Sequence, residues 1–190
     1  MIPYRSDEIR RRVVRFNIPG DAHELTFSCF RRKPLLRSRI ANQFLAKSIN
    51  AAAIIHDFEI WAWVFMPEHI HLMLYPLNAE YSVSDILKSI KQSSARKMIH
   101  FWVENRPDAL RHLETGLAKP KYRFWQNGGG YDRNYRSVES IRKQIDYIHE
   151  NPVRRGLVDE SVIWEWSSAR YWLRDGESAV VIRREHLSLA

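Results

Sequence analysis

The central segment of the chain reads Met66-Pro67-Glu68-His69-Ile70-His71-Leu72-Met73-Leu74-Tyr75 and predicts a turn followed by a β-strand. Side chains alternate between the two faces of a strand, so residues 70, 72 and 74 share an apolar face. His69 and His71 share the other face, where two neutral imidazoles can bind a single metal ion. Two ordinary sheet histidines remain the alternative, because a His-x-His pattern alone is weak evidence.

Length and composition indicate a globular protein of 190 residues. We expect one domain over residues 1–175, which includes a basic N-terminal arm, and a C-terminal tail over residues 176–190. The longest apolar run, residues 60–66, is too short to cross a bilayer, and residues 1–15 lack the apolar part of a secretory signal. Cys29 is the only cysteine. An internal disulfide is therefore excluded, and a cytoplasmic location is expected.

Positive charge is concentrated near the N-terminus. Residues 1–50 hold eleven Lys and Arg against four Asp and Glu, whereas the rest of the chain is nearly balanced. A local excess of this kind indicates a polyanionic partner, although a solubilising surface would look similar. The basic runs 10–12 and 31–33, together with many aromatic residues that can stack on unpaired bases, favour nucleic acid.

Hydrophobic periodicity predicts an α+β chain with alternating elements. Strands are expected at 25–30, 58–66, 69–75 and 122–126, and helices at 38–56, 82–103 and 137–151, the last ended by Pro152. The strand at 58–66 is apolar on both faces, with Trp61, Trp63 and Phe65 on one of them, which is typical of a central strand. This order predicts a ferredoxin-like split βαβ fold. Its antiparallel sheet would carry helices on one face, plus an added C-terminal helix that bears a tyrosine.

The last predicted helix has a polar stripe that includes Tyr147 and Asn151, one turn apart. A phenol is a poor nucleophile unless its target is polarised, which a metal held by the two histidines could do for a phosphate. The amide oxygen of Asn151 could complete the metal shell. The alternative is a boundary tyrosine followed by a C-capping asparagine. Tyr131 and Tyr135 are rival nucleophiles in a predicted glycine-rich loop, which would position a group less well.

Two motifs resemble one family of DNA transposases. Pro-Glu-His-Ile-His at residues 67–71 is similar to the His-hydrophobic-His (HUH) signature of single-tyrosine transposases. The segment Tyr-Ile-His-Glu-Asn-Pro-Val-Arg-Arg-Gly-Leu-Val at residues 147–158 resembles the tyrosine helix of the REP-associated tyrosine transposases, relatives of insertion-sequence transposases. The resemblance extends over residues 13–172. It does not cover the three glycines at 128–130 or the tail.

The resemblance implies a role for each matching residue. His69 and His71 correspond to the metal-binding pair, Tyr147 to the nucleophile and Asn151 to a third metal ligand. The implied metal is Mg²⁺ or Mn²⁺, whereas imidazole ligands alone would favour zinc. The implied activity is a metal-dependent single-stranded DNA endonuclease and strand transferase, which acts on hairpin (REP-type) DNA through a 5′-phosphotyrosine. Such a protein would act as a monomer or a homodimer, and it would not bind a membrane.

Basic side chains are expected to bind this DNA. The candidates are Arg10, Arg11, Arg12, Arg15, Arg31, Arg32, Lys33, Lys88, Lys91, Arg154 and Arg155. Two other functions stay open at this point. One is a catalytically inactive, domesticated protein that binds hairpin DNA or RNA. The other is a metal-dependent hydrolase in which the two histidines activate water.

Overall fold

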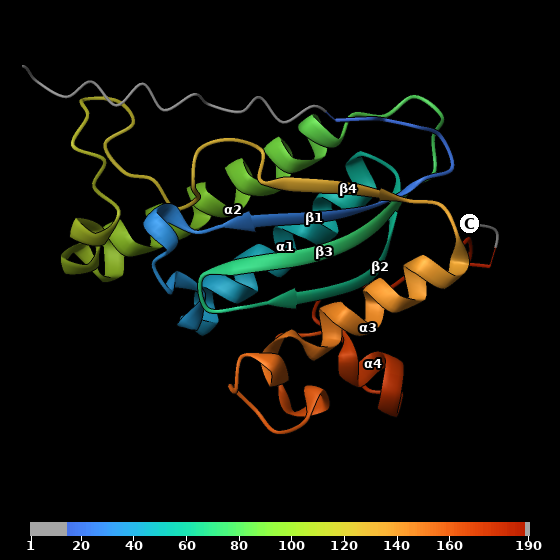
Figure 1. Cartoon of the computed structure of the whole chain (residues 1–190). Coiled ribbons are helices and arrows are strands. Elements are labelled where there is room, and N and C mark those ends of the chain that lie inside the picture. The colour runs from blue at the N-terminus through green and yellow to red at the C-terminus, as the bar shows by residue number, and fades with distance from the viewer. Residues whose placement is uncertain (1–14, 189–190) are drawn as a thin grey trace, which may run out of the picture.

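The computed structural model describes residues 15–188, so the predicted DNA-binding residues Arg10, Arg11 and Arg12 lie outside the described residues. Its centre is a four-stranded sheet (Figure 1) made of β1 (Ala22–Ser28), β2 (Phe58–Phe65), β3 (His69–Pro76) and β4 (Tyr131–Tyr135). The strand order is β2-β3-β1-β4, and every neighbouring pair is antiparallel. This arrangement confirms the predicted ferredoxin-like sheet.

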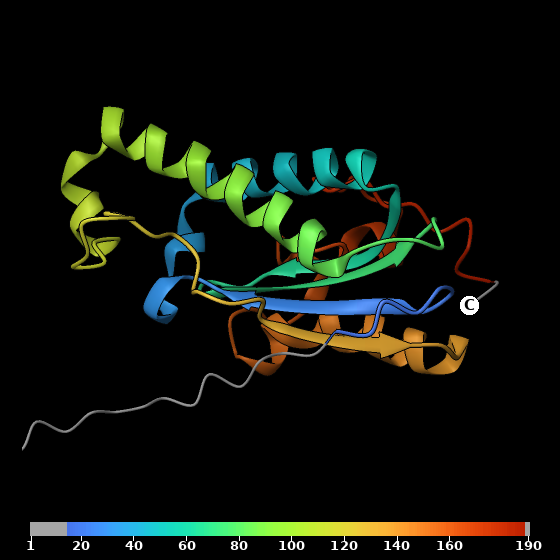
Figure 2. The ribbon, with the colours of Figure 1, turned by 90° about the horizontal axis from the view of Figure 1, so that it is seen from above.

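Helices cover both faces of the sheet. The long helices α1 (Arg39–Ile55) and α2 (Val83–Asn105) lie together on one face, and α3 (Val138–Arg154) lies on the other (Figure 2). The short helix α4 (Ala169–Arg174) follows α3. Serine side chains cap the N-termini of the three long helices, because Ser38, Ser82 and Ser137 each accept a hydrogen bond from a free backbone N–H.

The strand β2 lies at the edge of the sheet, so its predicted central position is wrong. It is apolar on both faces because one face packs on α1 and α2 and the other on α3. A bulge between Ile60 and Ala62 also shifts the alternation. Trp61 therefore packs on the α3 side, while Trp63 packs on the α1 and α2 side.

The fourth strand is Tyr131–Tyr135 and not the predicted segment 122–126. The earlier segment is apolar because Phe124 and Trp125 are buried in the core beside α2, where the Trp125 indole donates to Ser94 Oγ. Its link to the sheet is one isolated bridge between Trp125 and Cys29. The true strand is polar, because it forms the other edge of the sheet. Propensity therefore favoured the wrong segment.

Two further boundaries differ from expectation. The first strand starts and ends earlier than predicted, and Phe30 begins a 3-10 turn (Phe30–Arg32). Pro152 does not end α3, which continues to Arg154. Proline cannot donate to the Ile148 carbonyl, and the side-chain amide of Asn151 reaches the carbonyls of Tyr147 and Ile148 at 2.8 and 3.5 Å.

The C-terminal segment packs against the domain. Val180 and Ile182 are buried with the α1 and α2 core. The backbone N–H of Arg183 donates to the Ile60 carbonyl at the free edge of β2. Within residues 15–188, no helix is long and apolar enough to span a membrane.

Candidate active site

The two histidines lie side by side at the start of β3. In the sheet register, His69 is opposite Ser28 and His71 is opposite Thr26 on β1. Their Nε2 atoms are 3.2 Å apart. His71 is buried and His69 is partly buried, on the sheet face that α3 covers. The alternation predicted from sequence therefore places the pair correctly.

Carboxylates hold the outer nitrogen of each imidazole. His71 Nδ1 lies 2.9 Å from Glu24 Oε1 and 3.1 Å from Thr26 Oγ1. His69 Nδ1 lies 3.1 Å from Glu68 Oε1, which also accepts from the Arg155 guanidinium at 2.9 Å. An ionised carboxylate only accepts, so each Nδ1 carries the proton. The lone pairs of both Nε2 atoms then face each other across 3.2 Å.

This geometry fits a shared cation. Two ligands at right angles around an ion, with bonds of about 2.1 Å, would lie about 3 Å apart. Burial is the main cause that lowers the pKa of His69 to about 4, so His69 is neutral at pH 7 and able to bind metal. Among residues 15–188, no three His, Cys, Asp or Glu side chains form a complete metal cage. An ion held by the pair would need amide, water or substrate oxygens as well.

Tyr147 projects from α3 toward the histidines. Its ring meets the His71 ring edge-on, with 6.1 Å between the centroids, and its side chain is partly open to solvent with 41% of the residue exposed. The Arg154 guanidinium lies 5.0 Å from the Tyr147 ring centroid. A cavity of about 390 Å³ opens beside these groups. Its lining residues are Glu24, Thr26, His71, Tyr131, Arg133, Tyr135, Gln144 and Tyr147.

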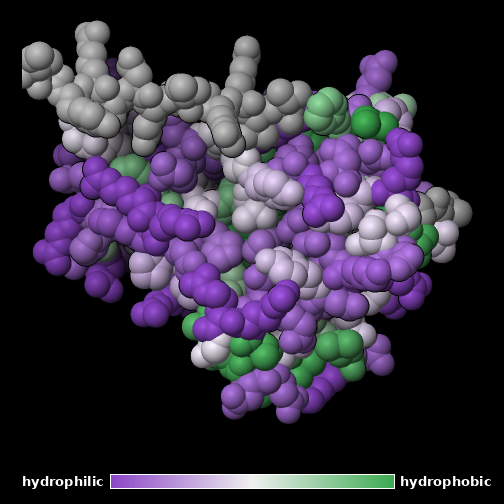
Figure 3. All heavy atoms as spheres, viewed as in Figure 1, coloured by the Kyte–Doolittle hydropathy of each residue, from purple (hydrophilic) through white to green (hydrophobic). Residues whose placement is uncertain are grey.

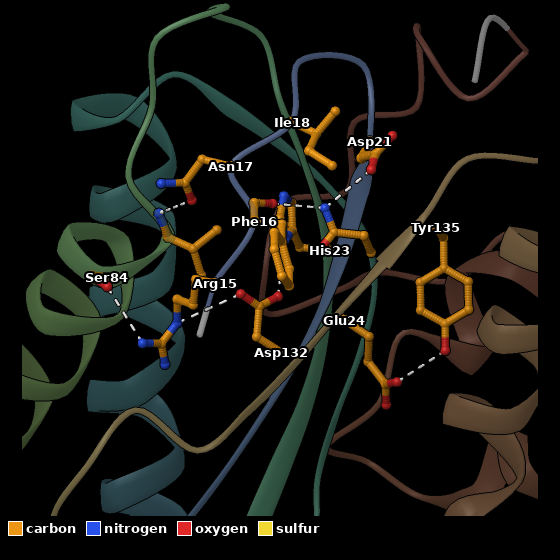
Figure 4. Close-up of polar contacts among 12 residues, drawn as sticks. Arg15, Phe16, Asn17, Ile18, Asp21, His23, Glu24, Ser84, Asp132 and Tyr135 are labelled. Atoms are coloured by element: carbon orange, nitrogen blue, oxygen red, sulfur yellow. Dashed lines mark hydrogen bonds and ion pairs between the residues drawn. The ribbon is translucent and has the colours of Figure 1, made fainter. Parts of the chain in front are cut away.

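The rival tyrosines occupy β4 and not the predicted loop. Tyr135 is buried, and its hydroxyl donates to Glu24 Oε2 at 3.3 Å (Figure 4). Burial, and next the charge of Glu24, raise its pKa well above the usual value for a phenol. Tyr135 is therefore a poor nucleophile. Tyr131 is exposed and lines the same cavity as Tyr147, so the cavity has two accessible phenols.

Asn151 lies one turn beyond Tyr147 and is buried within α3. It is not a C-cap, because the helix continues past it. Its side-chain nitrogen donates to the Tyr147 carbonyl, and among the described residues nothing donates to its Oδ1. The amide oxygen is thus free of protein donors among the described residues, and its role as a metal ligand stays a prediction.

The predicted DNA-binding side chains fall into three groups. Arg15, Lys88 and Lys91 line a groove beside α2. Arg154 and Arg155 lie at the tyrosine and histidine site. The third group follows β1 in the 30–33 turn, where Arg31 and Arg32 are exposed and the Lys33 ammonium donates to the His112 carbonyl.

Sequence reasoning missed Glu24, which contacts both His71 and Tyr135. A usable signal was present. Glu24, Thr26 and Ser28 alternate with apolar residues along β1, so they share the face of the sheet that carries the histidines. Figure 3 shows that the molecular surface on this side is largely hydrophilic, as a site for a polar ligand requires.

Comparisons with known proteins identify the family of the chain. The family described as "Transposase IS200 like" matches residues 22–151, which contain all four predicted catalytic and metal-binding residues. A REP-associated tyrosine transposase of Escherichia coli K12 is 26% identical over 73% of this chain and 69% of its own length. A provisionally named REP-associated tyrosine transposase of Haemophilus influenzae is 24% identical over 60% of each chain.

A solved structure shares the fold. It is described as a REP-associated tyrosine transposase bound to a REP hairpin, and it superposes with a TM-score of 0.66. It is 24% identical and covers 90% of this chain and 91% of its own. Together with the family match over most of the sheet and α3, these similarities confirm the resemblance drawn from the HUH and tyrosine motifs. The chain belongs to the IS200-like transposase family.

Proposed function

We propose that the chain is a metal-dependent single-stranded DNA endonuclease and strand transferase that acts on hairpin DNA. The observation that carries this proposal is the convergence of two imidazole lone pairs, 3.2 Å apart, with a solvent-accessible tyrosine edge-on to His71. Neither the histidine pair nor the tyrosine of α3 would indicate a DNA-cleaving site by itself. Family membership supports the combination, because the match includes both β3 and the tyrosine of α3.

The side chains would divide the reaction between them. Tyr147 Oη attacks phosphorus and loses its proton to solvent, a new P–O bond forms, and the bond from phosphorus to the 3′ oxygen breaks. The 3′ oxygen leaves with a proton as a free hydroxyl, and the 5′ phosphate stays on the tyrosine. Attack by a second 3′ hydroxyl reverses the step and joins DNA. No ATP is required, because the phosphotyrosine conserves the energy of the phosphodiester.

Mg²⁺ or Mn²⁺ would be held by His69, His71 and Asn151. When bound, such an ion supplies charge that polarises the scissile phosphate. Glu24 and Glu68 keep the two imidazoles in the tautomer with free Nε2 atoms, as the outer partners of metal-binding histidines commonly do. Arg155 in turn fixes Glu68, since its guanidinium lies 2.9 Å from the Glu68 carboxylate.

A REP-type hairpin is the proposed substrate. The support is the name shared by the curated relatives and a solved relative whose bound ligand is a REP hairpin. The exposed Arg31, Arg32 and Arg154 add positive charge on or near the site. Contacts of this type neutralise phosphates and should weaken steeply as salt is added.

A nicking assay tests the nucleophile. A fluorescently labelled hairpin with a single-stranded flank is incubated with Mn²⁺ and either the wild-type protein or Tyr147→Phe. We expect the variant to bind DNA normally and to lose cleavage by at least about 10³-fold, because the phenol oxygen forms the covalent bond. Tyr171→Phe, on α4 and away from the cavity, is the matched control. Nicking that persists in Tyr147→Phe would instead support a water-activating hydrolase, and binding without nicking by the wild type would support a binding protein without chemistry.

A further inference from the structure

A second, larger hollow lies away from the catalytic cavity, between α2 and the segment 120–129 that leads into β4. Its volume is about 700 Å³. Five cationic side chains line it, and no Asp or Glu does. These cations are Arg15, Lys88, Lys91, Arg96 and Arg123.

Most of these charges are not neutralised by the protein. Arg15 forms an ion pair with Asp132 at 3.5 Å and reaches Ser84 on α2 (Figure 4). Among the ion pairs of residues 15–188, none includes the other four groove cations. Burial, and next the charges of Arg15 and Arg123, lower the pKa of Lys91 to about 8. An anionic ligand would relieve this accumulation of positive charge.

The floor of the groove is apolar and partly aromatic. Leu87, Ala95 and Ile99 come from α2, while Tyr122 and Trp125 come from the facing segment. Anionic phosphates joined to flat apolar bases match a cationic rim above an aromatic floor. A double helix turns its bases inward, so it could use the rim but not the floor. The chemistry therefore favours unpaired nucleotides.

The groove adjoins the catalytic cavity. Gly128 and Gly129 line the groove, and Tyr131, two residues later, lines the cavity with His71. Two residues span at most about 7 Å. The Lys91 ammonium holds this border in place, because it donates to the carbonyls of Gln126 and Gly128 at 3.0 and 2.6 Å. A strand that leaves one hollow can therefore enter the other.

We propose that this groove binds unpaired nucleotides of the DNA strand, with phosphates on its cationic rim and bases over its apolar floor. The identity of the nucleic acid as DNA rests on the proposed function. Binding is measured in EDTA, without catalysis, so failure of Tyr147 as the nucleophile would leave this test unaffected.

Charge reversal tests the rim. Arg96→Glu and Arg123→Glu are each compared with Lys47→Glu, an exposed residue of α1 outside the groove. Affinity for fluorescent single-stranded oligo(dT) and for a duplex of equal length is measured over a series of salt concentrations. Each groove variant should weaken oligo(dT) binding about tenfold or more and lower the salt slope by about 0.7 per lost phosphate contact. Lys47→Glu should change affinity less than twofold.

Substitution of Tyr122 tests the floor. Tyr122→Ala should weaken oligo(dT) binding about tenfold through lost base stacking, whereas Tyr122→Phe should retain it. Thermal melts confirm that each variant is folded. Oligo(dT) affinities of Arg96→Glu and Arg123→Glu that match Lys47→Glu would overturn the proposal. An equal loss for the duplex, with Tyr122→Ala unchanged, would also overturn it, because the groove would then be a general phosphate surface.

Discussion

At the scale of single residues, the direction in which a nitrogen lone pair points matters more than the presence of a histidine. The sequence placed His69 and His71 on one face of a strand, and the register with β1 bears this out. Their tautomers depend on Glu24 and Glu68, and Glu24 lies 47 positions away from His71 in the chain. No local motif could reveal that partner, because antiparallel pairing of two strands creates the contact.

Glu24→Gln should weaken metal binding without unfolding the protein. Glutamine keeps the size of the side chain but removes the charge that strengthens His71 as a ligand, and loss of such a partner typically costs 10–100-fold in metal affinity. Titration of Mn²⁺ by electron paramagnetic resonance measures this loss directly.

Glu59→Gln provides the matched control for this experiment. Glu59 is an equally buried carboxylate bonded to a histidine Nδ1, that of His186, at 2.6 Å, and it lies outside the site. The variant Glu59→Gln should lose stability but keep the Mn²⁺ affinity of the wild type. Equal Mn²⁺ affinities for the wild type and Glu24→Gln would show that Glu24 does not support the metal ligand.

At the scale of elements, the edge strand β4 was hardest to predict. Its sequence is polar, and pairing with β1 stabilises it more than its own propensity does. The chain enters it through Gly130, which has a φ of +73° and lies against the backbone of Thr26. A glycine is required there, so the glycine run marks the start of a strand and not a free loop.

Gly130→Ala should destabilise the fold more than Gly128→Ala. A Cβ on Gly130 would lie 2.1 Å from the Thr26 carbonyl oxygen, whereas a Cβ on Gly128 meets no atom within 4 Å. Both residues have positive φ, so the backbone strain of about 1 kcal/mol is shared and the clash is specific to Gly130. We expect thermal melts to place Gly128→Ala about 2–4 °C below the wild type and Gly130→Ala at least twice as far below it. Equal shifts would mean that β4 does not pack on β1 as described.

At the scale of the whole molecule, the fold and the site were predictable to different degrees. Periodicity predicted three strands and three helices in the right order, because their apolar faces pack against one another. The tyrosine stripe of α3 was also recognisable. Three features depend on tertiary contacts, so the sequence could not reveal them. They are the bulge in β2, the position of β2 at the edge of the sheet, and the packing of residues 179–183 against that edge.

Stability should fall in mild acid because a buried histidine resists protonation. His149 is buried on α3, its Nε2 lies 2.9 Å from Ser168 Oγ, and burial lowers its pKa to about 4. An unfolded histidine titrates near pH 6.5, so below that pH the unfolded chain binds a proton that the folded chain does not. The free energy of unfolding should therefore be level above pH 7, and His149 alone should remove about 3 kcal/mol of it as pH falls from 6.5 to 4.

Urea denaturation at several pH values measures this slope. His69 contributes in the same direction, since its pKa is also lowered to about 4. The variant His149→Gln should be less stable at pH 7 and show a shallower loss between pH 6.5 and 4. Identical slopes for His149→Gln and the wild type would show that this histidine does not control the acid sensitivity.

The central claim is that Tyr147 and the histidine pair form one catalytic site, and a covalent-adduct assay tests it most directly. The protein is mixed with single-stranded hairpin DNA from beside its own gene, in Mn²⁺ or in EDTA, and separated on a denaturing gel. We predict a DNA-linked protein band in Mn²⁺ that disappears in EDTA and in Tyr147→Phe, and that persists in Tyr171→Phe. A band that survives in Tyr147→Phe, or no band on DNA that the protein binds, would contradict the claim.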